Sequence, residues 1–536
     1  MRKVFIFLLF SALAINVKAG GIVTNTNQSA SFTRMAARDA SVGVDATYFN
    51  PAGLTQLKNG FHVSLSNQYI TQTRTISTTY PGLNQNEFEG SVLAPIFPSV
   101  YAVYKKDKIA FSLGFNPIGG GGSALYEDGL PSFEMQVAGL PPSLNGAGIP
   151  TTKYSYDTEF EGKSVYYGIQ AGVSYEINEM LSVSLGLRYV TINNSYVGYL
   201  NNIQINPTFP ALNYTGTMVK APTFFTDLSG YLGNVSGQLS ATSSSLQPIL
   251  DGGGGSVPLA NGTQAGLTAA QVATLQGTIA GLGGDPTNMT IAQAQGFFFG
   301  VSQQFAANSA AMAANATATS DKEVDASQSG SGIVPIVGVN LKFDRLNVGI
   351  KYEHKASIKV KNATKVDDVG LYPDGAEVPS DMPAMLSIGA AFDATDKLKL
   401  SAGFHTYFDK GAEYGKRLNN EYVKNDMVMD KNLWEAAFGI EYALNEKWLV
   451  SIGYLRTTTG VMDLYQSDLS HSLSTNSIGG GLRFQLNENL GINLGAMNTM
   501  YIENTREFAA KPPMPAYNET YNRKAFTLGL GLDLSF

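Results

Sequence analysis

The sequence predicts a transmembrane antiparallel β-barrel of about fourteen strands, with an N-terminal plug (hatch) in its lumen and helical insertions in its extracellular loops. Three observations lead to this prediction. The chain opens with an export signal. Only 15% of its 536 residues are charged, although it holds 27 tyrosines and 28 phenylalanines. Many segments alternate apolar and polar residues, which places each kind on one face of a strand.

The first element is a secretory signal peptide at residues 1–19. Arg2 and Lys3 supply its positive start, an apolar run extends from Val4 to Ile15, and Ala19 closes a cleavage motif of small residues. A run of about twelve apolar residues is too short for a membrane anchor, which needs about 20. No later segment is long and apolar enough for a helical span. Because only helices and closed barrels satisfy their backbone groups in lipid, we expect a barrel in a bacterial outer membrane.

Residues 20–58 form the second element, which does not alternate and is longer than a periplasmic tail requires. Either it is a disordered periplasmic extension or it is a plug inside the barrel. The aromatic corner at 48–54 favours the plug, because Pro51 restricts Asn50 and a preset corner loses less entropy on ordering. Asn50 is expected to cap a turn with its side chain. The corner consists of Tyr48, Phe49, Asn50, Pro51, Ala52, Gly53 and Leu54.

The barrel is expected over residues 59–536. In 526–536, apolar residues from Phe526 to Phe536 alternate with Thr, Gly, Asp and Ser. Tight polar turns are expected at 105–108, 177–180, 342–345, 393–396, 444–446 and 486–489. These hairpins, with one strand before them (about 60–73) and one after them (about 523–536), give about fourteen strands with both termini on the short-turn side.

Longer connections lie on the other side of the barrel, at about 74–97, 118–162, 200–331, 362–382, 410–431, 458–473 and 507–522. The insertion at 200–331 contains two segments that the pattern predicts to be helical, Thr268 to Ala280 and Ile291 to Asn315. A long loop with its own secondary structure is usually functional or disordered. Its aromatic residues either bury against each other in a cap or form an external platform that captures an apolar ligand. They are Phe297, Phe298, Phe299 and Phe305.

The composition excludes several classes of function. There are no cysteines, so disulfides and thiolate chemistry are absent, and a net charge of −7 without a basic stripe argues against nucleic acid. The histidines show neither metal-ligand spacing nor a neighbouring carboxylate motif. They are His62, His354, His405 and His471. We therefore expect no metal, no cofactor and no enzymatic activity.

With its hatch corner, the sequence resembles the outer-membrane transporters of long-chain fatty acids and related hydrophobic compounds, the FadL/TodX type. The resemblance rests on DATYFNPAGL at 45–54, directly before the first strand, and is weakest through 200–331. It implies that this corner belongs to a hatch plugging a fourteen-stranded barrel. The final Phe536 is the usual ending of chains delivered to the barrel-assembly machinery, although unrelated barrels share it.

The resemblance also implies passive transport. External loops capture the ligand, a lumen pocket binds it, and it leaves sideways into membrane lipid beside a kinked third strand. Proline and glycine weaken a strand ladder, so the third strand has a candidate break here. The alternative is that the strand simply ends there. The break comprises Phe115, Asn116, Pro117, Gly119 and Gly120.

Recognition of a carboxylate would require a cation near an apolar pocket. Arg188 and Lys410 are the candidates, unless they pair with Asp39 and Asp45 of the hatch. The family's basic pocket positions hold amides here, near Asn193. The ligand is therefore either a long-chain fatty acid or a neutral hydrocarbon or lipid. The alternative function is a porin-like or surface-interaction barrel without specificity for hydrophobic ligands.

Overall fold

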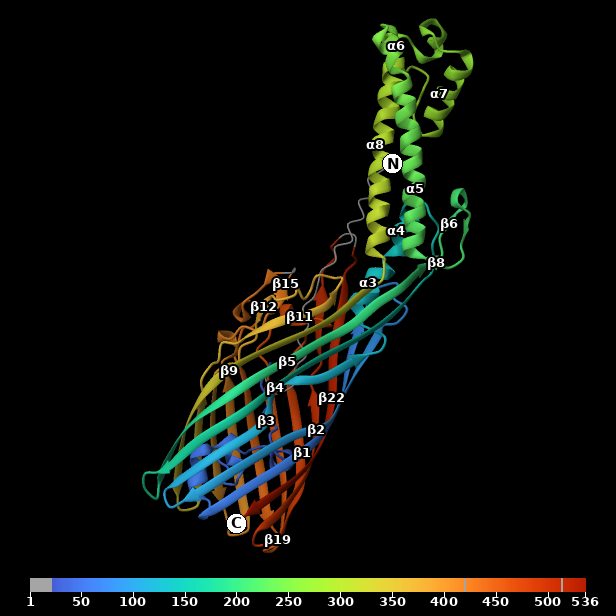
Figure 1. Ribbon diagram of the computed structural model, residues 1–536. Coiled ribbons are helices and arrows are strands. Elements are labelled where there is room, and N and C mark those ends of the chain that lie inside the picture. The colour runs from blue at the N-terminus through green and yellow to red at the C-terminus, as the bar shows by residue number, and fades with distance from the viewer. Residues whose placement is uncertain (1–21, 419–420, 512–513) are drawn as a thin grey trace. The chain divides into compact units, whose positions relative to one another are not determined.

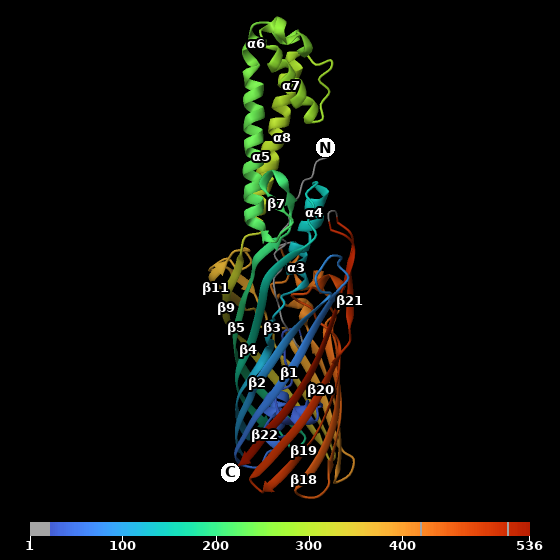
Figure 2. The ribbon, with the colours of Figure 1, turned by 90° about the vertical axis from the view of Figure 1, so that its right-hand side faces the viewer.

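The computed structural model describes residues 22–418, 421–511 and 514–536, and most of them form a closed antiparallel β-barrel (Figure 1). The predicted signal peptide at 1–19 lies outside the described residues. Fourteen strands follow one another in chain order around the wall, and hydrogen bonds between the first and the last close it. Figure 2 shows these two strands, β1 and β22, side by side. The wall strands are β1 (Gly60–Thr78), β2 (Glu87–Lys106), β3 (Ile109–Tyr126), β4 (Tyr154–Glu176), β5 (Leu181–Ile205), β9 (Lys322–Phe343), β10 (Leu346–Glu353), β13 (Met385–Asp393), β14 (Leu398–Tyr407), β17 (Leu433–Ala443), β18 (Trp448–Thr458), β19 (Thr475–Asn487), β20 (Leu490–Tyr501) and β22 (Tyr517–Ser535).

The predicted tight turns are confirmed. They join β2 to β3, β4 to β5, β9 to β10, β13 to β14, β17 to β18 and β19 to β20. The outer ends of several strands were misjudged, because their residues are polar on both faces and show no hydrophobic alternation. The connection expected at 74–97 covers only 79–86, and the one expected at 118–162 covers 127–153. Shorter strands extend the wall or lie in its connections: β11 (Lys359–Asp367), β12 (Glu377–Pro379), β15 (Arg417–Leu418), β16 (Glu421–Tyr422) and β21 (Asn504–Phe508).

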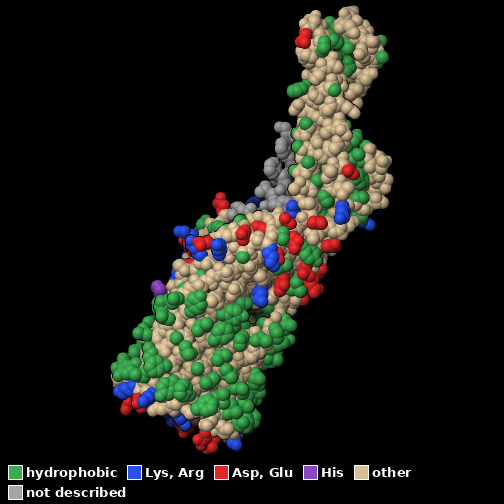
Figure 3. Space-filling model, in the orientation of Figure 1, with side chains coloured by type: hydrophobic (Ala, Val, Ile, Leu, Met, Phe, Trp, Pro, Cys, Tyr) green, Lys and Arg blue, Asp and Glu red, His purple; other side chains and the backbone are tan. Residues whose placement is uncertain are grey.

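The two faces of the wall differ as a membrane barrel requires. Leu185, Leu187 and Leu530 are more than half exposed on the outside. Figure 3 shows hydrophobic side chains covering the barrel wall and charged side chains gathered at its rim. Among the described residues, no helix is long and apolar enough to cross a membrane.

The N-terminal segment before β1 is almost completely buried and packs against the inner wall. It contains α1 (Ala30–Arg34), α2 (Ala46–Phe49) and the 3-10 helix η1 (Pro51–Gln56). Glycines on the wall make room for it: a Cβ atom on Gly495 would lie 2.7 Å from the backbone nitrogen of Arg34. The predicted hatch inside the lumen is therefore confirmed, and a free periplasmic extension is excluded for residues 22–58. We call residues 22–58 the hatch.

The insertion between β5 and β9 contributes most of a second compact unit, which comprises residues 136–157 and 201–321. The predicted helices are confirmed as α7 (Ala269–Gly281) and α8 (Ile291–Ala318), whereas α5 (Ala221–Ser245) was not predicted. Along α5, serines spaced by seven residues donate hydrogen bonds to carbonyl groups of α8. These are Ser229, Ser236 and Ser243, which bond to Ser309, Ser302 and Gln295. The remaining α-helices and short strands between β3 and β9 are α3 (Pro131–Ala138), α4 (Leu140–Gly146), β6 (Thr208–Phe209), β7 (Tyr214–Thr215), β8 (Val219–Lys220) and α6 (Gln247–Asp251).

Candidate ligand site and gate

The aromatic corner of the hatch is anchored in the barrel lumen. Tyr48 and Phe49 are each 1% exposed, and Leu54 is fully buried. The Tyr48 ring packs edge-on to Phe49 at 5.0 Å and lies under two cations, Lys351 at 4.5 Å and Arg188 at 5.0 Å. Cations over an aromatic face are attracted by its quadrupole. The corner therefore connects hatch packing directly to charged residues of the wall.

Asn50 has a different role from the one expected. Its side chain caps no helix; Nδ2 donates to the carbonyl of Ser41 at 3.0 Å and to Oδ1 of Asn340 on β9 at 2.7 Å. Pro51 does occupy the first turn of η1, as its fixed φ favours. The prediction of a side-chain cap was wrong because a partner distant in sequence satisfies the amide.

Ion pairs and hydrogen bonds join the hatch to the wall at several points. Arg34 pairs with Glu441 on β17 at 2.5 Å. His405 on β14 lies between Asp39 of the hatch and Glu435 of β17, and its Nδ1 is 3.1 Å from Glu435. The sequence around His405 shows no carboxylate motif, because Asp39 and Glu435 are brought to it only by the fold. Among the described residues, no group of His, Asp and Glu is arranged to hold a metal ion.

Arg188 faces the lumen but is fully engaged by protein groups. Its guanidinium pairs with Glu353 on β10, with Nη2 at 2.9 Å from Oε1, and donates to Gln170 at 2.7 Å. Lys351 shares Glu353 at 2.8 Å. The expected pairing of Arg188 with Asp39 or Asp45 is wrong, because Asp39 contacts His405 and Asp45 pairs with Arg38 at 2.8 Å. A ligand carboxylate would have to displace Glu353 to reach Arg188.

The wall has a break between β2 and β3. Residues pair regularly from Lys106–Ile109 up to Val100–Phe115, and the next pair along β3 is Ser91–Leu125. Residues 116–124 of β3 therefore have no ladder partner on β2. Strand β3 continues to Tyr126, so the break lies within the strand rather than at its end. The predicted residues occupy this break: Asn116, Pro117, Gly119 and Gly120 lie in it, and Phe115 forms the last regular pair.

Both strands contribute to the break. Gly120 and Gly122 have φ values of +86° and +72°, which glycine adopts without steric cost. On β2, Pro95 and Pro98 lack the N–H that a ladder bond would need. These two prolines are a signal of the break that can be read in the sequence, and the prediction from β3 alone did not include them.

The hatch occupies the inner side of this break. Asn25 donates its backbone N–H to Ile118 at 2.8 Å and its side-chain amide to Gly120 at 2.9 Å, while Gly120 donates to Val23 at 3.0 Å. Gln28 donates to the carbonyl of Pro117 at 2.7 Å. The chain from 23 to 28 thus provides the kinked part of β3 with hydrogen bonds that β2 does not supply. We call this contact the hatch–kink contact.

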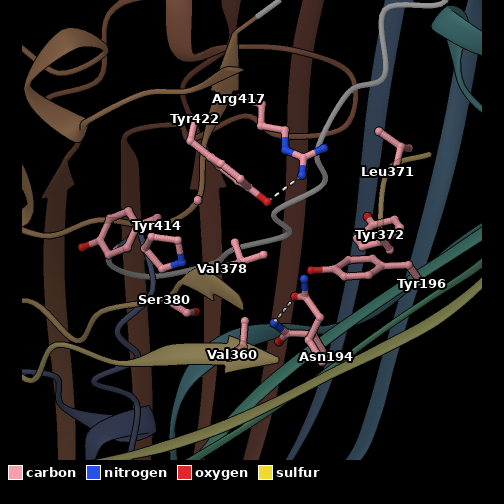
Figure 4. Close-up of a pocket in the computed structure, with 13 residues that line it drawn as sticks. Asn194, Tyr196, Val360, Leu371, Tyr372, Val378, Ser380, Tyr414, Arg417 and Tyr422 are labelled. Carbon is pink, nitrogen blue, oxygen red and sulfur yellow. Dashed lines mark hydrogen bonds between the residues drawn. The ribbon is translucent and has the colours of Figure 1, made fainter. Parts of the chain in front are cut away.

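A small pocket lies elsewhere in the barrel, lined by strands β5, β9, β11 and β12 and by the connection after β14 (Figure 4). Its cavity is about 20 Å³, which is room for a water molecule. Tyr196 and Tyr372 stack at 4.7 Å on one side, and Arg417 donates to the Tyr422 hydroxyl at 2.6 Å on the other. Among the described residues that line the pocket, Arg417 is the one that carries a charge. The pocket is aromatic, and a larger ligand would have to displace these rings.

The other predicted ligand residues are not among those that line this pocket. Lys410 is in the connection after β14, exposed, and donates to the carbonyl of Asp430 at 3.1 Å. Within the helical insertion, Phe298 is fully buried, and Phe297 and Phe305 pack against the same core. Phe299 alone is exposed, at 57%. Three of the four phenylalanines therefore belong to the hydrophobic core of the insertion itself.

Searches against known proteins give structural matches only. No family model and no curated protein matches the sequence. The crystal structure of a Pseudomonas aeruginosa FadL homologue matches 96% of this chain and 100% of its own, with a TM-score of 0.58 and 13% identity. The structure of the P. putida toluene transporter TodX matches 92% of this chain and 94% of its own, with a TM-score of 0.48 and 13% identity. The first of these likenesses shows the fold of the barrel and nothing more.

Proposed function

We propose, on the barrel fold that this chain shares with a FadL homologue, that it moves hydrophobic small molecules passively across a bacterial outer membrane and releases them sideways into lipid. The hatch closes the direct route along the lumen. The break between β2 and β3 gives a second route that leads to the surrounding lipid. The cargo follows from the resemblance of the sequence and from the aromatic lining of the pocket, and no energy source is required.

The observation that carries this proposal is the hatch–kink contact. A closed barrel in lipid must satisfy its backbone groups within the wall, yet over part of its course β3 bonds to the hatch instead of to β2. Release of a few hydrogen bonds would therefore open the wall without breaking a full strand ladder. An acyl chain that leaves through the wall does not have to enter water. Keeping it out of water is worth about 0.8 kcal/mol per CH₂.

A variant in which β2 and β3 can pair along their whole length, which we call the repaired-wall variant, tests this proposal. Residues 116–122 are replaced by a regular alternating strand, and Pro95 and Pro98 by threonine, so that β2 and β3 can pair throughout. We expect the purified variant to bind a fluorescent fatty acid as the natural protein does, while delivery of that probe into proteoliposome lipid is lost. Unchanged delivery by a variant whose wall is shown to be paired would refute lateral release.

A second test separates transport from the porin-like alternative. Deleting residues 20–58 removes the hatch. We expect the deletion variant to conduct small ions much more freely than the natural barrel. A natural barrel that already conducts small ions as freely as the deletion variant would favour a porin-like function instead.

A further inference from the structure

Strands β1, β22, β20 and β19 carry an apolar groove on the outer face of the barrel wall. These strands are neighbours in the ladder and lie side by side in Figure 2. The groove has a volume of about 440 Å³, within the range of about 300–1,000 Å³ that is usual for ligand sites. Among the described residues that line the groove, none is charged.

The shape of the groove comes from one row of the ladder, in which the side chains become smaller from strand to strand. The row begins with Tyr69 on β1 and Leu528 on β22, which are 42% and 46% exposed. It continues with Ala496 on β20 and ends with Gly480 on β19. The glycines beside the last three residues face the hatch, so the row itself points out of the barrel. The next row toward the chain termini consists of leucines, Leu530, Leu494 and Leu482.

The groove has to be filled when the barrel lies in a membrane. The outward face of a membrane barrel is in contact with lipid hydrocarbon. A void beside Ala496 and Gly480 would leave the surrounding side chains without van der Waals partners on one side. The occupant is therefore apolar where it lies in the groove, and either a lipid chain or another membrane protein satisfies this condition.

Polar side chains follow the groove toward the long connections of the barrel. Asn498 lies two residues beyond Ala496 on the same face of β20, between Ile478 and Phe526 of the neighbouring strands. It is exposed, and its side chain forms no hydrogen bond with a described residue. An amide without a partner in apolar surroundings costs free energy. A ligand that fills the groove would lower this cost if it offered Asn498 an acceptor.

Two cations lie one row further out, about 7 Å beyond Asn498 along the strands. They are Arg456 on β18 and Lys524 on β22, whose Cα atoms are about 14 Å apart across the ladder. Arg456 donates to Asn476 at 3.2 Å, and neither cation forms an ion pair with a described carboxylate. Glu503, beyond this row, accepts from Asn522 at 3.3 Å. Cationic side chains at a membrane surface attract anionic lipids.

A second copy of the barrel fits this surface less well than a lipid. Two barrels related by a twofold axis along the membrane normal would meet with the same rows facing each other. The rows that hold Arg456 and Lys524 would then be opposed, and like charges across an interface oppose association. A phosphate-bearing lipid offers an acyl chain to the groove, an ester carbonyl to Asn498 and a negative charge to the two cations.

We propose that the groove binds one membrane lipid that carries an anionic phosphate head group, in the leaflet on the side of the long connections. An acyl chain fills the groove over Ala496 and Gly480, an ester carbonyl accepts from Asn498, and Arg456 and Lys524 bind the phosphate. This site lies outside the lumen. It requires that the barrel spans a membrane, and it does not depend on the cargo that the barrel moves.

Native mass spectrometry of the full-length barrel in detergent tests the charged end of the site. The probes are dihexadecanoyl phosphatidic acid and dihexadecanoyl phosphatidylcholine, which share their tails and ester groups and differ in net charge. We expect Arg456→Gln and Lys524→Gln each to lower the affinity for phosphatidic acid about fivefold and to leave that for phosphatidylcholine unchanged. Lys163→Gln is the matched control, because Lys163 is exposed on β4, away from these strands.

The double variant Gly480→Leu with Ala496→Leu tests the apolar end by filling the groove. A Cβ atom on Gly480 would lie 3.6 Å from its nearest neighbour, the carbonyl oxygen of Ser451, so a side chain can be added without a clash. The matched control is Ala390→Leu with Ala402→Leu, because these two alanines are also opposed on adjacent strands and point outward. We expect the filled-groove variant to lose both lipids while the control keeps them, with equal melting temperatures for the two variants.

Three outcomes would overturn the proposal. The first is undiminished binding of phosphatidic acid by the filled-groove variant, or equal loss in both double variants. The second is a natural barrel that is dimeric and becomes monomeric only when the groove is filled, which would assign the groove to a second copy. The third is displacement of phosphatidic acid by equimolar hexadecanoate, which would assign it to cargo. Lateral release is tested separately by the repaired-wall variant.

Discussion

Weakening the hatch–kink contact should open the wall without unfolding the barrel. In the double variant Asn25→Ala, Gln28→Ala, two side-chain hydrogen bonds to the kink are removed, those to Gly120 at 2.9 Å and to Pro117 at 2.7 Å. The backbone bonds of Asn25 and Gly120 remain. Each lost bond is worth about 1 kcal/mol, so the pair contributes about 2 kcal/mol, or about thirtyfold in the population of the released state.

The assay is transfer of a fluorescent hydrophobic probe into the lipid of proteoliposomes. We expect faster transfer by the double variant, by up to about thirtyfold if release limits the rate, with little change in barrel melting. Asn27→Ala is the control, because Asn27 lies in the same segment but bonds to Gln68 on β1 at 3.1 Å. Equal rates for the natural protein, the double variant and the control would refute the gating role of the contact.

Three further predictions concern stability. Arg188→Met leaves Glu353 without its main counter-ion and should lower the free energy of unfolding, measured by chemical denaturation, by about 3–5 kcal/mol. A loss below about 1 kcal/mol would show that Lys351 alone is enough to neutralise Glu353. Phe298→Ala should cost the helical insertion about 3–5 kcal/mol, seen as rapid proteolysis of that region, while Phe299→Ala changes its stability by less than about 0.5 kcal/mol; equal effects would contradict the packing described. Because the folded pKa of Lys416 is about 7 and its unfolded pKa is about 10.4, the unfolded chain holds the extra proton between these values, so stability rises with pH from about 7 to about 10. That rise should be smaller in Lys416→Met, and parallel melting profiles for the two proteins would contradict it.

The fold could be predicted closely because it depends on local signals. Polar turns such as the one at 177–180 fix hairpins, and alternation in 526–536 fixes a strand, so the number and order of wall strands followed directly. Helix α5 escaped prediction because serine, threonine and glycine, which are common in loops, make up much of its sequence, and three of the serines bond to α8. Its buried apolar residues, such as Leu239, therefore do not stand out as a stripe.

Only those parts of the site that lie within one continuous segment of the chain could be predicted from the sequence. The corner at 48–54 and the break of β3 are contiguous and were found. The cluster of Asp39, His405 and Glu435 joins the hatch to wall strands more than 300 positions further along the chain. It has no characteristic sequence spacing, because docking of the hatch creates it.

Photo-crosslinking of a transported ligand tests the central claim most directly. A fatty acid with a diazirine at its tail is added from outside to the natural barrel in lipid and activated by light. If cargo leaves through the wall, adducts should form on residues 92–99 of β2 and 116–124 of β3, and should disappear from that region in the repaired-wall variant. Adducts confined to the periplasmic end of the hatch, with none at the β2–β3 break, would contradict lateral release.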